Sequence, residues 1–220
     1  MPDALDALDA LIHEFVGSVC DAVSDAVDVA PEAVAIARHV RGVRAMRNPI
    51  DAHRLPGCDF LDDALNRALH ADDPGIVGIS ALIERLAPHL HWILREGLPG
   101  AAADFPFRHA NAIVVGDNGL NGLNGLNWLN GLARAEVTVG LTVMAPQAVY
   151  ADHHHPPEET YLVLSEGEWR QNAEAWHSPG VGGTVYNPPG IVHSMRSLGS
   201  PLLAVWMLRP STGAGHTAPS

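Results

Sequence analysis

The spacing of the apolar residues changes once along this chain, near residue 105. Before that point they recur every three or four positions, as in Leu5, Leu8 and Ile12, which is the period of a helix with one buried face. After it, short segments rich in β-branched and aromatic residues are separated by glycine and proline, a pattern typical of antiparallel strands. We therefore predict an α+β protein in which a helical region over residues 1–105 packs on a β-barrel over residues 106–210, with a flexible tail over 211–220.

The same pattern predicts the individual elements. Helices are expected over residues 4–27, 31–46, 61–69 and 80–97. The last of them should kink or break at Pro88, because proline cannot donate a helical hydrogen bond. Strands are expected over residues 111–116, 135–144, 159–165, 183–189 and 202–208.

A three-residue repeat of asparagine, glycine and leucine runs over residues 118–132, between the first two predicted strands. Asn-Gly pairs favour tight turns, so the repeat is expected to form a loop. It could act as a mobile lid over a pocket, or it could be a loop expansion that the fold tolerates at low cost, and we favour the second interpretation.

The charge of the chain points to a small molecule as its partner. Acidic residues outnumber basic ones by 25 to 13, for a net charge of −12. Because contacts to nucleic acid and to anionic lipid need clustered lysine and arginine, neither is expected as a partner. Cys20 and Cys58 form no paired motif, and the sequence has neither a secretory signal nor an apolar stretch long enough to span a membrane. A cytoplasmic protein is therefore expected, and a homodimer is left open.

The segment "DHHHPPEETY", residues 152–161, is dense in metal-binding side chains. On a strand, His153 and His155 would face the same side, and after the intervening turn Glu159 and Tyr161 would share one face. His193 follows a Pro-Gly turn further along the chain. Three imidazoles and one carboxylate suit a single divalent transition metal ion such as zinc, iron or manganese, with positions left for water or substrate.

His154 should face the opposite way if the strand is regular, so it is left out of the ligand set. A bulge could exchange its role with that of His153, and His154 is kept among the candidate substrate-binding residues. The remaining histidines have no comparable partners in the sequence and are expected at the surface or at helix ends. They are His13, His39, His53, His70, His89, His91, His109, His177 and His216.

The spacing of the predicted ligands resembles the two cupin motifs. His153, His155 and Glu159 fit the first motif, although its leading glycine is absent and its closing glycine, Gly167, is one residue late. The second motif is matched at every position but the last, where serine replaces asparagine. Its residues are Gly182, Pro188, Gly190, His193 and Ser197. The resemblance implies that the β-barrel is a cupin, a double-stranded β-helix.

Residues 147–208 resemble the cupin-type lyases of dimethylsulfoniopropionate (DMSP) more specifically, through "YADHHHPPEETYLVLSEGEWRQ" and "PPGIVHSMRS". The resemblance implies β-elimination of DMSP to dimethyl sulfide and acrylate, with the metal binding the substrate carboxylate. A base must then remove the proton from the α carbon. Tyr161 is predicted to be that base because it follows Glu159 by two residues. The resemblance also places Tyr150 in the pocket, where it could position the substrate or share the base role.

The sulfonium end of DMSP is a cation, which aromatic faces attract. Besides Tyr150, the candidates for this contact are Trp169 and Trp206, for which core packing is an equal alternative. Two other functions stay open at this stage. One is an oxygen-using cupin acting on a thiol or a diketone, since three histidines and a glutamate can also hold iron. The other is a non-catalytic cupin that binds a small molecule and does not need Tyr161 as a base.

Overall fold

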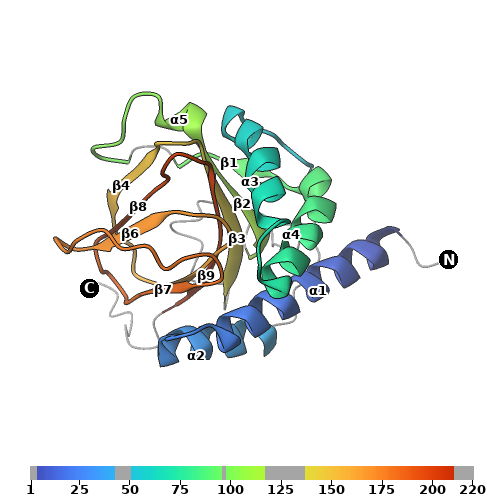
Figure 1. The fold of residues 1–220 in the computed structure, drawn as a ribbon. Helices are drawn as coiled ribbons and strands as arrows, with labels where there is room; N and C mark the ends of the chain where they lie inside the picture. The colour runs from blue at the N-terminus through green and yellow to red at the C-terminus, as the bar shows by residue number, and fades with distance from the viewer. Residues whose placement is uncertain (1–3, 43–50, 96–97, 117–136, 211–220) are drawn as a thin grey trace, which may run out of the picture.

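The helices of the computed structural model lie in the first half of the chain (Figure 1). The structure describes residues 4–42, 51–95, 98–116 and 137–210. The predicted repeat loop at 118–132 and the predicted tail at 211–220 lie outside these residues. The helices are α1 (Ala4–Asp25), α2 (Pro31–Gly42), α3 (Leu61–Ala68), α4 (Pro74–Leu86) and the short α5 (Phe105–Arg108), with 3₁₀ turns η1 (Pro56–Phe60) and η2 (Ala87–His89).

The predicted helix over residues 80–97 is wrong at both ends. Helix α4 begins at Pro74, because the side chain of Asp73 accepts hydrogen bonds from the backbone amides of Gly75 and Ile76. It ends at Leu86, and the break expected at Pro88 is present as η2. Residues Trp92–Ile93 then form strand β1, because their backbone pairs with β2 in place of continuing a helix.

The strands form two antiparallel sheets within the described residues. The six-stranded sheet has the order β1-β2-β3-β9-β5-β7, and the three-stranded sheet has the order β4-β8-β6. The strands of the first, after β1, are β2 (His109–Val115), β3 (Thr138–Met144), β5 (Glu158–Val163), β7 (Thr184–Asn187) and β9 (Leu202–Arg209). The strands of the second are β4 (Val149–His153), β6 (Glu168–Gln171) and β8 (His193–Arg196).

All three strands of the smaller sheet are missing from the list predicted by periodicity. They are only four or five residues long, and sequences such as "EWRQ" and "HSMR" are polar. A segment this short and polar lacks the alternation that identifies a half-buried strand. Because the pairing gives two sheets, closure into a complete barrel stays a prediction, as does the division of the chain at residue 105.

The six-stranded sheet is buried on both faces, and one apolar cluster lies on each face. On one face, residues such as Leu203 and Val205 pack against the helices in a single continuous cluster. On the other face, Ala204 and Trp206 pack toward the smaller sheet with Tyr150 and Met195. Figure 1 shows α1, α3 and α4 on one side of β2 and β3, and the smaller sheet on the other. The space between the sheets is therefore where strand side chains converge.

None of the described helices combines the length and the apolar character needed to cross a membrane.

Candidate metal centre and active site

Three histidines converge between the two sheets. His153 ends β4 and is the cross-strand partner of His193, which begins β8, while His155 follows two residues after the end of β4. Each is less than one-tenth exposed, and one ring nitrogen from each lies within 4.8 Å of the others. The bulge in the β4–β8 pairing between Tyr150 and His153 adjusts the direction of the strand just before the cluster.

The backbone fixes which nitrogen of each ring points into the cluster. In all three histidines Nδ1 lies at hydrogen-bond distance from a carbonyl oxygen, which can only accept, so Nδ1 carries a proton and Nε2 of the neutral ring presents a lone pair. The carbonyl partners are Ala151 for His153, Pro157 for His155 and Ile191 for His193, at 2.9, 2.9 and 3.0 Å. This is how metal-binding histidines are usually oriented in proteins.

Glu159 on β5 brings a carboxylate to the same point from the opposite sheet. Its Oε2 lies 3.4 Å from Nε2 of His155 and 3.1 Å from Nε2 of His193. Burial opposes ionisation of Glu159, but positive charge on the neighbouring His155 outweighs burial and holds the pKa of Glu159 well below its ordinary value. A bound ion would take the place of that proton. Burial also lowers the pKa of His153 to about 3, which keeps that ring neutral.

This donor set fits a divalent cation. A carboxylate oxygen faces ring nitrogens that present lone pairs, and His193 Nε2 has no hydrogen-bond partner among the described residues. Donors bound about 2.1 Å from one ion are separated by roughly 3–4 Å, which is the spacing of Glu159 from His155 and His193. Nitrogen and carboxylate donors of this kind suit zinc, iron and manganese alike, so the donor set leaves the metal open.

Both candidate tyrosines line the pocket at this cluster and are buried. Tyr161 shares a face of β5 with Glu159, and burial together with the Glu159 carboxylate raises the pKa of Tyr161 well above its ordinary value. The Tyr150 ring packs 4.5 Å from the His153 ring, centroid to centroid. Burial raises the pKa of Tyr150 to about 12, and the charge of the Arg95 guanidinium acts in the opposite direction. Both phenols are affected by both charges, but Glu159 has the larger effect on Tyr161 and Arg95 has the larger effect on Tyr150.

The other predicted substrate contacts separate into one inside the pocket and two outside it. Trp206 lines the pocket, and it has room there because its cross-strand partner is Gly140. A Cβ at position 140 would lie 2.2 Å from the indole. Trp169 is fully buried behind Tyr161, with ring centroids 5.9 Å apart, and does not line the pocket. His154 is exposed and follows directly after the end of β4.

The structure adds pocket residues that periodicity did not identify. Arg95 and Asn111 line the cavity together with Tyr150. Arg95 reaches the site because β1, which ends two residues earlier, pairs Ile93 with Asn111. Periodicity did not identify Arg95 as a pocket residue, because "HWILREG" also continues the helical pattern of the preceding segment.

His109 is a correction to the prediction of a surface or capping residue. It is fully buried, stacked on Phe105 at 4.7 Å and set edge-on to Tyr150 at 4.7 Å. Burial lowers its pKa to about 3, so it is a neutral ring that holds Tyr150 in place from behind.

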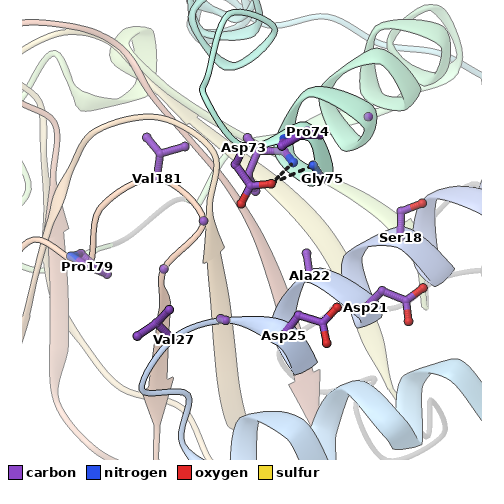
Figure 2. A pocket seen from close by; sticks show the side chains of 15 residues that line it. Ser18, Asp21, Ala22, Asp25, Val27, Asp73, Pro74, Gly75, Pro179 and Val181 are labelled. Carbon is purple, nitrogen blue, oxygen red and sulfur yellow. Dashed lines mark hydrogen bonds between the residues drawn. The ribbon is translucent and has the colours of Figure 1, made fainter.

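The cavity between these side chains is narrow. Its free volume is about 20 Å³, space for about one water molecule. A larger ligand can enter only if lining side chains move. A more open hollow of about 700 Å³ lies between α1, the start of α4 and residues 179–183 (Figure 2). Two of its carboxylates already have structural partners, since Asp73 caps α4 and Asp21 pairs with Arg41. Of these two cavities, it is the narrow one that brings together three histidines and a carboxylate.

Comparison with known proteins agrees with this geometry. A family model described as dimethylsulfoniopropionate lyase matches residues 20–204, most of the chain. The chain belongs to the cupin-type DMSP lyase family. The match spans all four candidate ligands of this DMSP lyase family member and both of its pocket tyrosines, and it confirms the family predicted from the sequence motifs.

Solved structures of DMSP lyases share the fold of this family member. A structure reported with the DMSP lyases RdDddP and RnDddQII has a TM-score of 0.69 at 20% identity, covering 94% of this chain and 96% of its own. DMSP lyase DddQ from Ruegeria pomeroyi DSS-3 has a TM-score of 0.59 at 20% identity, covering 78% and 80% of the two chains. A search of curated proteins finds no match. At this identity the structures establish the cupin-like fold, with helices first and antiparallel sheets after them.

Proposed function

We propose that this member of the DMSP lyase family cleaves DMSP to dimethyl sulfide and acrylate in a metal-dependent β-elimination. The observation that carries the proposal is the convergence of three histidine lone pairs and a carboxylate beside two buried tyrosines, in one cavity of a chain of this family. In this proposal His153, His155, Glu159 and His193 hold one divalent ion. When bound, the ion withdraws electron density from the substrate carboxylate and adds positive charge beside the pocket phenols.

Tyr161 is the proposed base. Tyr161 lies two residues from the ligand Glu159 on β5 and lines the same cavity, which places it next to any group held at the metal centre. In the proposed reaction Tyr161 acts as its phenolate, a form that the positive charge of a bound ion would favour, and the phenolate oxygen takes the proton from the α carbon of DMSP to become the neutral phenol. The electron pair of that C–H bond forms the double bond of acrylate, and the pair of the C–S bond leaves with sulfur as neutral dimethyl sulfide. The leaving group is uncharged, so the pocket does not need an acid to protonate it.

The charges of the pocket favour one orientation of this zwitterionic substrate. The Arg95 guanidinium attracts the carboxylate and repels the sulfonium group. Trp206 offers an aromatic face for the sulfonium, a contact worth about 0.5–2 kcal/mol. Arg95 and Trp206 both line the cavity. The substrate would therefore bind with its carboxylate toward Arg95 and the metal ligands and its sulfonium toward the indole.

Replacing Arg95 with glutamine should raise KM for DMSP by about 10–100-fold, because a hydrogen bond to a charged group contributes about 1.5–3 kcal/mol. Arg95→Lys should retain part of the affinity, since it keeps the charge but loses the forked geometry. Steady-state kinetics of the two variants would measure this. A variant Arg95→Gln with wild-type KM and a reduced kcat would mean that Arg95 acts on Tyr150 and not on the substrate.

Headspace detection of dimethyl sulfide over purified, metal-loaded protein mixed with DMSP tests the function directly. The proposal expects dimethyl sulfide and acrylate in equal amounts, with no oxygen consumed. Oxygen uptake with a thiol or a diketone, without dimethyl sulfide, would point instead to an oxygen-using cupin. Binding of DMSP without turnover would point to a non-catalytic small-molecule-binding cupin.

A further inference from the structure

The candidate metal ligands are divided between the two sheets. His153 and His193 belong to the three-stranded sheet, whereas Glu159 belongs to β5 of the six-stranded sheet. The separation of Glu159 from His193 therefore depends on how the sheets are held against each other at this point. Apolar packing alone holds such a separation loosely, because it is not directional.

Two amide side chains link the sheets beside the ligands. Asn187 on β7 is the cross-strand partner of Glu159, and its Nδ2 donates to Glu159 Oε2 at 3.0 Å. Gln171 on β6 is the cross-strand partner of His193 in the other sheet. Its Nε2 donates to Asn187 Oδ1 at 2.7 Å and to the Tyr186 carbonyl oxygen at 2.6 Å.

The directions of these hydrogen bonds are mutually consistent. A carboxylate and a carbonyl can only accept, so the Asn187 amide nitrogen must face Glu159 and the Gln171 nitrogen must face Tyr186. That leaves Asn187 Oδ1 to accept from Gln171, as observed. Asn187 is fully buried, so neither hydrogen bond competes with bulk water.

We infer that Asn187 and Gln171 are positioning residues of the metal centre, which fix the Glu159 carboxylate of one sheet against His193 of the other. The inference rests on the metal site of the proposed function, but not on its substrate. Neither amide lines the cavity. Their effect on a bound ion is through the orientation of Glu159, the role that partners of metal ligands commonly have.

The test is a titration of the metal-free full-length protein with Zn²⁺ in competition with a chromogenic chelator. Asn187→Leu keeps nearly the same volume and removes both hydrogen bonds, so the Zn²⁺ Kd should rise by about 10–100-fold. Gln171→Met should weaken binding in the same direction by less. In the Asn187→Leu background Gln171→Met should add little, because Gln171 acts through Asn187.

Ser165→Ala is the matched control. Ser165 is also buried and makes two hydrogen bonds, to the Pro201 carbonyl and from the Leu203 amide, but it lies outside the cavity. It should lower the Tm of the metal-free protein and leave the Zn²⁺ Kd unchanged. If Asn187→Leu binds Zn²⁺ like the wild type, or if all variants lose affinity in step with Tm, the inference is wrong. Should Asn187→Leu not fold, the half-buried Gln171→Met decides by the same criterion.

The two proposals fail in different ways in this experiment. A wild-type protein that binds Zn²⁺ and loses affinity on Asn187→Leu, but releases no dimethyl sulfide from DMSP, would leave the positioning role standing and remove the lyase function. An active lyase whose Zn²⁺ Kd is unchanged by Asn187→Leu would leave the lyase function standing and remove the positioning role.

Discussion

Conversion of Tyr161 to phenylalanine is expected to lower kcat for DMSP cleavage by about 10²–10⁴-fold, the usual contribution of a general base. The variant keeps the ring that packs against Trp169 and removes only the hydroxyl beside Glu159. The loss should therefore fall on kcat more than on KM. The measurement is steady-state release of dimethyl sulfide from variants with matched metal content.

Tyr150→Phe is the control for this prediction. It is equally buried and lines the same cavity, but the charge with the larger effect on its pKa is that of Arg95, followed by that of the Glu159 carboxylate. If Tyr150 positions the substrate, its loss should be smaller and should fall partly on KM. Near-full turnover in Tyr161→Phe together with an inactive Tyr150→Phe would reverse the two roles. The cation beside Tyr150 would then be the reason, since it stabilises a phenolate.

Removal of the metal ligands should have the largest effect of all. His193→Ala, and a variant lacking both His193 and Glu159, should lose the bound ion on dialysis and should release dimethyl sulfide no faster than the uncatalysed background. The reason is that an ion held by few donors loses both affinity and geometry when one or two are removed. Elemental analysis of the purified proteins gives the metal content, and the headspace assay gives the activity.

His154→Ala is a matched control for the ligand variants, because His154 is adjacent in sequence but exposed. It should keep wild-type metal content and activity. Full metal occupancy in the variant lacking His193 and Glu159 would contradict the ligand assignment. Loss of metal in His154→Ala would show that the strand presents a different histidine to the ion.

The cluster was accessible from the sequence because it depends on local geometry. Alternation along β5 brings Glu159 and Tyr161 to one face, whereas β4 ends at His153 and His155 reaches the cluster from the two residues that follow. The change of apolar period likewise separates helices from strands, since each period reflects one buried face. His193 was assigned through a motif spacing, and the cross-strand pairing of His193 with His153 agrees with it.

Tertiary structure alone decided which other residues reach the site. Arg95 lies in a segment with helical periodicity, and it enters the cavity because β1 pairs with β2. Trp169 and Trp206 look equivalent in sequence, yet only Trp206 lines the pocket, because Gly140 opposite it leaves room for the indole. Asn187 and Gln171 come into contact because β7 of the six-stranded sheet lies against β6 of the three-stranded sheet at this point. Periodicity reports which face of a segment is buried, whereas the partner on that face is set by long-range packing, which no local pattern contains.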